Sequence, residues 1–171
     1  RSLKPYWLVL PCSPLTRAFS MQGILFVCLG NICRSPLAQG IFEHRISELG
    51  ITNHFYADSA GTSAWHEGEP PHGGSIKVAK KYGIGIEKQR SRPVHLKDGE
   101  IFDYVIAMDN ANFSSLTTEF RFPVNKVHLM RDFSLSEPRK KGLTVPDPWG
   151  HGPEAFEEVF AILQDAVEGL I

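Results

Sequence analysis

The sequence has few cysteines, no excess of charge of one sign and no long apolar run. Three cysteines in 171 residues are too few, and odd in number, for a disulfide framework. Lys and Arg number 18 against 19 Asp and Glu, for a net charge of -1, which argues against a broad basic surface for nucleic acid or for membranes. No apolar run approaches the roughly 18 residues of a membrane span. Together these features predict a cytoplasmic protein in a reducing compartment.

The composition is that of a globular chain, with 42% apolar and 22% charged residues. It excludes a disordered chain, a fibrous repeat and a coiled coil. Residues 1–20 differ from the rest, because they hold three prolines and only a short apolar patch. We interpret them as an N-terminal extension, non-native or disordered, and 21–171 as the single domain. A signal peptide is the alternative, disfavoured because Pro11 ends the apolar patch so early.

Apolar runs and helical periodicities alternate along the domain. Strands are predicted at 24–28, 54–57, 103–108 and 126–130, and helices at 36–49, 71–82, 110–119 and 153–170. Strands separated by helices favour parallel pairing. We therefore expect an α/β three-layer sandwich, in which a four-stranded parallel sheet is flanked by helices on both faces. Ligands of such sheets bind at the carboxyl ends of the strands.

The stretch that follows the first strand, VCLGNICRSP (27–36), suggests phosphate chemistry. Its loop N–H groups and the start of the next helix would form a nest for a dianion. Arg34 would hold two phosphate oxygens, and the same positive field would favour the thiolate of Cys28, a nucleophile for phosphorus. Ser35 and Pro36 are predicted to open the helix, with Ser35 as its N-cap.

Three further residues of this stretch have a physical reason to be there. Gly30 lets the backbone turn, and Asn31 tolerates a left-handed conformation while bonding the loop to the scaffold. Ser35 can donate its hydroxyl to the sulfur of Cys28. The alternative is a chance Cys-Arg spacing around an inert buried cysteine. The strand before the loop and the helix start after it favour the functional interpretation.

Four motifs together resemble a known family, the low-molecular-weight protein tyrosine phosphatases. The resemblance covers residues 23–170 and rests on VCLGNICRSP (27–36), DSAGTSAW (58–65), FDYVIAMD (102–109) and VPDPW (145–149). It implies that Cys28 is the nucleophile, Arg34 the phosphate clamp and Asp147 the general acid. It also implies a set of phosphate-binding and supporting residues, namely Leu29, Gly30, Asn31, Ile32, Cys33, Ser35 and Ser59. The implied substrate is a phosphotyrosine protein, with a cognate tyrosine kinase as a further partner and with no cofactor or metal.

The role of Asp147 as general acid also has a physical argument that does not depend on the resemblance, since a departing alkoxide or phenoxide needs a proton donor. Pro146 and Pro148 would stiffen its loop, although an ordinary Asp-Pro turn is the alternative. Trp65 and Trp149 are candidates for the rim of a slot deep enough to exclude phosphoserine. Core packing is the alternative for both tryptophans.

Two positions depart from the family pattern. Trp149-Gly150 stands where animal members carry two adjacent tyrosines, and Tyr82 stands where many relatives place a histidine of the hydrogen-bond network. The resemblance also implies that Cys33 can form a reversible disulfide with Cys28 under peroxide, a buried structural thiol being the alternative. The histidines have no metal-ligand spacing with the cysteines.

Three rival functions fit the same scaffold. An arsenate reductase would need resolving cysteines further along, and none follows Cys33. By resemblance, a protein-arginine phosphatase would carry Thr at the position of Ile32. A non-catalytic phosphate-binding or thiol-sensing module would have no use for Asp147. The sequence therefore predicts a phosphotyrosine phosphatase.

Overall fold

The computed structural model describes residues 20–171. The expected extension at 1–20 thus falls, apart from Ser20, outside the described residues. None of the helices within residues 20–171 is both long and apolar enough to cross a membrane.

The core of the molecule is one parallel sheet. Its strands are β1 (Gln22–Cys28), β2 (Phe55–Gly61), β3 (Tyr104–Ala107) and β4 (Val127–Leu129). They lie in the order β2-β1-β3-β4, and every pair is parallel. This confirms the predicted four-stranded parallel sheet and places β1, which leads into the 28–34 loop, at its centre.

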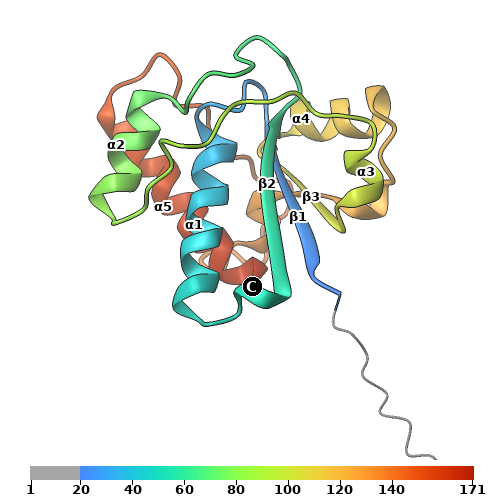
Figure 1. Cartoon of the computed structure of the whole chain (residues 1–171), viewed down its shortest axis with the longest axis horizontal. Helices are drawn as coiled ribbons and strands as arrows, with labels where there is room; N and C mark the ends of the chain where they lie inside the picture. Colours follow the sequence, from blue (N-terminus) through green and yellow to red (C-terminus); the bar gives the residue numbers. More distant parts are fainter. Residues whose placement is uncertain (1–19) are drawn as a thin grey trace, which may run out of the picture.

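Helices cover both faces of this sheet. They are α1 (Arg34–Glu48), α2 (Gly73–Lys81), α3 (Asp98–Ile101), α4 (Asn110–Ser114) and α5 (Pro153–Leu170). Figure 1 shows α1, α2 and α5 on one side of the sheet and α3 and α4 on the other. A π-helical turn at Ser115–Glu119 continues α4. The three-layer sandwich predicted from the sequence is confirmed.

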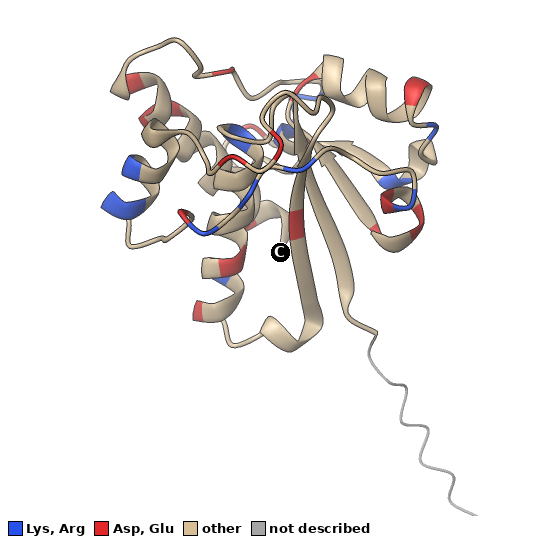
Figure 2. Cartoon of the chain, turned by 45° about the horizontal axis from the view of Figure 1, so that its top comes forward, with Lys and Arg blue, Asp and Glu red and all other residues tan. Residues whose placement is uncertain are grey.

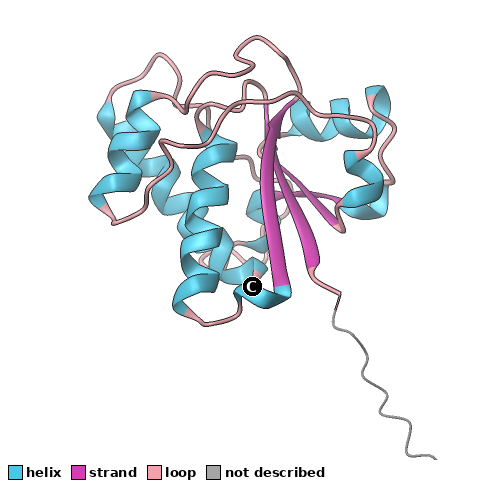
Figure 3. Ribbon diagram, in the orientation of Figure 1, coloured by secondary structure: helices cyan, strands magenta, loops and turns pink. Residues whose placement is uncertain are grey.

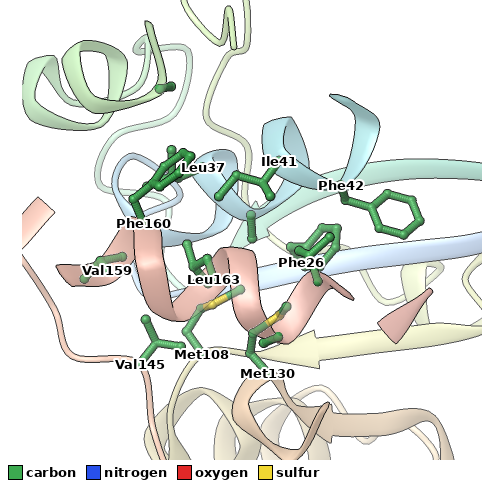
Figure 4. Close-up of a cluster of buried hydrophobic side chains, with 14 of the residues drawn as sticks. Phe26, Leu37, Ile41, Phe42, Met108, Met130, Val145, Val159, Phe160 and Leu163 are labelled. Carbon is green, nitrogen blue, oxygen red and sulfur yellow. The ribbon is translucent and has the colours of Figure 1, made fainter. Parts of the chain in front are cut away.

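Successive side chains of β1 point to opposite faces of the sheet, where they pack into two hydrophobic clusters. Ile24, Phe26 and Cys28 face the larger cluster with α1 and α5, whereas Leu25 and Val27 face the smaller cluster on the opposite side. Because all five are almost fully buried, β1 has no polar face, as expected for a central parallel strand. Figure 4 shows side chains of the larger cluster, from Phe26 on β1 to Leu163 on α5.

The ends of several elements differ from the prediction. The second strand continues to Gly61, although 59–62 had the composition of a turn. The reason is tertiary: the backbone of Gly61 bonds to residues 92 and 94 and so keeps an extended conformation. Helix α1 begins at Arg34, and Ser35 does not cap it. Gly50 and Gly83, with φ of 69° and 78°, end their helices as predicted.

Candidate active site

The site lies where the loops follow the carboxyl ends of the strands. Residues 28–34 run from the end of β1 to the first residue of α1, and Figure 3 shows loops gathered at this end of the sheet. The position is the one expected for ligands of parallel α/β sheets.

The loop is held from outside through its carbonyl groups. Three backbone N–H groups donate to these carbonyls: Thr62 to Cys28 (2.9 Å), Ser63 to Leu29 (3.0 Å) and His72 to Ile32 (2.7 Å). Two side-chain hydroxyls do the same: Ser91 to Gly30 (3.1 Å) and Ser75 to Cys33 (2.9 Å). Five carbonyl groups of the loop are thus engaged by the surrounding scaffold, so amide groups other than that of Asn31 can serve an anion, which is the arrangement of a phosphate nest.

Asn31 fixes the turn of the loop. Its backbone is left-handed, with φ of 53°, a conformation that asparagine adopts more readily than most residues. Its side-chain Nδ2 donates to Ser35 Oγ at 2.8 Å and to Ser59 Oγ at 2.9 Å. Its Oδ1 accepts from the backbone N–H of Arg92 at 2.9 Å. The whole amide is therefore saturated, as a buried polar group requires.

Two donors surround the sulfur of Cys28. Ser35 Oγ lies 3.1 Å from Sγ, and the N–H of Asn31 donates to Sγ at 3.3 Å. Because Asn31 already donates to Ser35 Oγ, the hydroxyl hydrogen of Ser35 is free to point at the sulfur. The predicted N-cap role of Ser35 is thus wrong, and its predicted bond to Cys28 is present.

Arg34 is 3% exposed and connects three segments. One terminal nitrogen, Nη1, donates to Asp109 Oδ2 at 2.7 Å and to the carbonyl of Val145 at 3.1 Å. The other, Nη2, donates to Asp147 Oδ2 at 3.3 Å. Burial lowers the pKa of the guanidinium, but the neighbouring Cys28 and the two carboxylates raise it by more, so Arg34 is a permanent cation.

The Nε–H group of Arg34 is buried and has no hydrogen-bond partner among residues 20–171. An unsatisfied buried donor costs about 1–3 kcal/mol, more when it is charged. Such a cost is expected where a ligand supplies the missing acceptor. The orphaned donor belongs to a residue that lines the central pocket, so an anionic ligand there would satisfy it.

The loop that carries Asp147 is anchored by Val145. This valine is 1% exposed, its N–H donates to the carbonyl of Met108 at 2.8 Å, and the two side chains belong to one cluster (Figure 4). Asp147 follows two residues later, and its side chain is 46% exposed. Its Oδ1 accepts from the N–H of Trp149 at 3.1 Å, which orients the carboxylate.

These residues enclose a pocket of about 290 Å³. The lining residues are Cys28, Leu29, Gly30, Ile32, Cys33, Arg34, Trp65, His66, Asp147 and Trp149. All except His66 were predicted as site residues, and the remaining predicted residues, Asn31, Ser35 and Ser59, form the hydrogen-bonded set described above. Trp65 and Trp149 are 76% and 63% exposed, so they lie at the rim rather than in the core.

Sequence reasoning missed three contributors. His66 lines the pocket beside Gly30 and is paired through Nδ1 with Glu69 at 2.8 Å. Gln39 Oε1 accepts a hydrogen bond from the hydroxyl of Ser59 at 2.8 Å. Asp109 was identified only as an N-cap, which it is, but it also holds Arg34. Its place just beyond a strand end, where parallel strands meet, was the signal for that second role.

Of the two alternatives for Tyr82, that it replaces the network histidine or that a different bond serves, the structure excludes the first, because Tyr82 lies outside this network. Its ring stacks on Phe160 at 4.2 Å between centroids, and its hydroxyl donates to Glu157 at 3.1 Å. The physical reason is its position at the end of α2, where it faces α5 rather than the sheet edge.

Cys28 and Cys33 are both buried free thiols. Burial, reinforced by the charges of Cys28 and Asp147, raises the pKa of Cys33 from 9.0 to about 12, although Arg34 and Ser75 oppose the rise. Cys33 is therefore a neutral thiol at physiological pH.

Positive charge at this end of the sheet is local. Figure 2 shows Lys and Arg intermixed with Asp and Glu over the described residues, and among the residues that line the pocket Arg34 is the one with a cationic side chain. Within residues 20–171, no three His, Cys, Asp or Glu side chains are grouped so that they could hold a metal ion.

Comparison with known proteins agrees with this geometry. Residues 23–171 match the family described as low molecular weight phosphotyrosine protein phosphatase. The low molecular weight protein-tyrosine-phosphatase YfkJ of Bacillus subtilis is 40% identical over 151 residues, which cover 88% of this chain and 94% of YfkJ.

Solved structures share the fold as well. A protein tyrosine phosphatase from Entamoeba histolytica, crystallised with Hepes in the active site, is 38% identical with a TM-score of 0.78, covering 87% of this chain and 94% of that chain. A Drosophila arginine phosphatase is 28% identical with a TM-score of 0.77, covering 86% and 94% of the two chains. From the family match and these identities, the chain belongs to the low molecular weight phosphotyrosine protein phosphatase family.

Proposed function

We propose that this chain hydrolyses phosphotyrosine in proteins, and small aryl phosphates, through a phosphate ester of Cys28. The observation that carries the proposal is the unsatisfied Nε–H of Arg34 in the pocket that also holds the Cys28 sulfur. A phosphoryl group in the nest would accept from this donor and from the loop amides. Its phosphorus would then face the thiolate.

In the first step, the Cys28 thiolate attacks phosphorus and the bond from phosphorus to the tyrosine oxygen breaks. Asp147 gives its proton to that oxygen, so that tyrosine leaves as a neutral phenol. In the structure, Asp147 contacts Arg34 at 3.3 Å. A bound phosphoryl group competes for the same guanidinium, which would release the carboxyl group toward the leaving oxygen.

In the second step, the Asp147 carboxylate takes a proton from water, whose oxygen attacks phosphorus. The sulfur–phosphorus bond breaks, and inorganic phosphate and the thiolate are regenerated. Ser35 Oγ, 3.1 Å from Sγ, stabilises the sulfur as it leaves with its electron pair. Loop amides and Arg34 stabilise the equatorial oxygens in both steps.

The depth of the pocket supports an aromatic substrate. Trp65 and Trp149 stand at its mouth with most of their surface exposed. Flat apolar walls suit the phenyl ring of phosphotyrosine. The shorter arm of phosphoserine would not bring phosphorus to the floor, where Cys28 is 2% exposed.

Cys33 has a protective role in this proposal. Both thiols line the same pocket, so oxidation of Cys28 to a sulfenic acid would be followed by attack of the Cys33 sulfur, loss of water and formation of a disulfide. Reductant would restore the enzyme. The C33S variant should keep its turnover in reductant but recover poorly after peroxide, and an unchanged recovery would remove this role.

The same proposal includes the cellular setting. A nucleophilic thiol requires a reducing compartment, which supports a cytoplasmic location, and a phosphotyrosine substrate requires a tyrosine kinase as its source. The domain is proposed to comprise residues 21–171. A chain without residues 1–20 should therefore keep its kcat/KM for aryl phosphate, and a large loss would contradict this boundary.

A panel of phosphotyrosine, phosphoserine and phosphoarginine peptides tests the substrate class, with wild type and C28S side by side. We expect turnover of the phosphotyrosine peptide by wild type only, together with retained phosphate binding by C28S. Preferential turnover of phosphoarginine would replace the proposed substrate. Substantial activity of C28S would overturn the nucleophile assignment.

A further inference from the structure

The 28–34 loop is braced from behind by residues 89–94, a segment that does not line the pocket. Ser91 Oγ donates to the carbonyl of Gly30 at 3.1 Å, and the N–H of Arg92 donates to Asn31 Oδ1 at 2.9 Å. The same segment is joined to the end of β2, because Gly61 N–H donates to the carbonyl of Arg92 at 2.8 Å. A shift of this segment would therefore move the backbone of Gly30 and the side chain of Asn31, which form the turn of the loop.

A guanidinium and two carboxylates hold this segment in place. Arg92 donates through Nε to Asp58 Oδ2 at 2.9 Å and through Nη1 to Asp98 Oδ2 at 2.9 Å. Asp98 is 4% exposed and Arg92 is 25% exposed. Loss of Arg92 would leave the charge of the buried Asp98 without a partner, which is costly. The ion pair therefore holds the segment in one position.

The ion pairs connect two of the three partners of the Asn31 side chain, Ser59 and Arg92. Ser59, which accepts from Asn31 Nδ2 at 2.9 Å, directly follows Asp58 in β2. Arg92, which donates to Asn31 Oδ1, is the ion-pair partner of that same Asp58. The ion pair between Arg92 and Asp58 thus fixes the distance between Ser59 Oγ and the N–H of Arg92, which bind the two sides of the asparagine amide.

We propose that Arg92 is a positioning residue for catalysis, which acts through Asn31 on the phosphate-binding loop. Its ion pairs keep Asn31 in the left-handed conformation, so that the loop amides face the phosphoryl group and Ser35 faces Cys28. This inference rests on the proposed role of the 28–34 loop, and it assigns to a residue outside the pocket a share of phosphate affinity and rate.

The test compares R92M and R92K with R90M as a matched control. Arg90 lies in the same segment, but within the described part of the chain its guanidinium donates only to the carbonyls of Glu87 and Gln89. We expect R92M to lower kcat/KM for p-nitrophenyl phosphate by about 10- to 100-fold and to weaken competitive inhibition by inorganic phosphate. R92K keeps the positive charge but lacks the planar guanidinium that can bond to two carboxylates at once, so it should recover part of the lost kcat/KM and part of the phosphate inhibition. R90M should match wild type in both.

A double-mutant cycle with N31A separates positioning from general stability. If Arg92 acts through Asn31, R92M should add less than about threefold to the loss already caused by N31A. The proposal would be overturned if the fold-loss of kcat/KM in the R92M/N31A double variant equalled the product of the losses in the two single variants. It would also be overturned if folded R92M were inhibited by phosphate as strongly as wild type. If R92M does not fold at the assay temperature, R92K decides, and wild-type phosphate inhibition in folded R92K would overturn it.

Failure of the proposed function is seen separately. Wild type that binds phosphate without hydrolysing aryl phosphate would contradict the reaction. In that case a direct calorimetric titration of inorganic phosphate into wild type, R92M and R90M, which needs no turnover, would still test Arg92. Active wild type with R92M indistinguishable from it would contradict only the positioning role.

Discussion

At the scale of single residues, Arg34 determines how the site is arranged. One buried guanidinium holds Asp109 beyond β3, the carbonyl of Val145 and the carboxylate of Asp147. These partners come from distant parts of the chain, so the guanidinium sets their mutual distances. Its unsatisfied Nε–H is the donor left for substrate, which explains why a lysine, with its single charged nitrogen, could not replace this residue.

The role of Asp147 can be tested by varying the leaving group. In D147A, hydrolysis of phenyl phosphate should slow by about 10²–10⁴-fold, because a phenoxide of high basicity needs the proton. Hydrolysis of an aryl phosphate with a strongly acidic phenol should slow much less. Steady-state kcat/KM over a series of substituted phenyl phosphates measures the difference, because this ratio reports the step in which the phenol leaves and not the later hydrolysis of the phosphocysteine.

D132A is the matched control, because Asp132 is an acidic residue of the same long connection that does not line the pocket. Its leaving-group dependence should equal that of wild type. Equal slowing of all substrates in D147A would show that Asp147 shapes its loop without transferring a proton.

At the scale of elements, sequence patterns predicted the helices and strands better than they predicted the ends that form the site. The stripe on α5 predicted its bounds, Pro153–Leu170, because hydrophobic periodicity is a local signal. The extension of β2 to Gly61 depends on partners some thirty residues away. Ser35 likewise had the local features of a cap, but its hydroxyl is used for the Cys28 sulfur instead.

The end of β2 gives a prediction about close packing. A Cβ at Gly61 would meet the carbonyl oxygens of Leu29 at 2.8 Å and Ser63 at 2.9 Å. Both are backbone atoms that cannot turn aside, so G61A should push the phosphate-binding loop and lower kcat/KM for aryl phosphate by at least about tenfold.

G73A is the matched control for G61A. A Cβ at Gly73 meets nothing within 4 Å, and alanine favours the helix that begins there, so its activity should equal that of wild type. Wild-type kcat/KM in G61A would show that the contact between β2 and the loop does not matter for catalysis.

At the scale of the whole molecule, the site depends on every layer of the sandwich. Its residues come from the end of β1, the segment after β2 and the connection before α5, and two hydrophobic cores hold these elements together. The sequence identified almost all of the pocket, because the chemistry lies in contiguous motifs. It did not predict His66, Gln39 or the brace at Arg92, because these contacts exist only after folding.

Alkaline pH should destabilise the folded chain through Cys33. The pKa of this thiol is raised from 9.0 to about 12 by burial, so between these values the folded state binds the proton more tightly than the unfolded state. Its contribution to stability is complete below about pH 9 and is lost as the pH rises toward 12. Urea unfolding across this range should give a steeper fall in unfolding free energy for wild type than for C33A. Parallel curves would contradict the burial of this thiol.

The proposed reaction depends on a covalent bond between the Cys28 sulfur and phosphorus. D147A slows both steps, and rapid acid quenching during turnover of p-nitrophenyl phosphate, followed by mass spectrometry of the peptides, would detect the intermediate. We expect a phosphoryl group on the peptide that contains Cys28, and its absence in the D147A/C28S double variant. A phosphoryl group on another residue, or hydrolysis that continues at full rate with none on Cys28, would contradict the account.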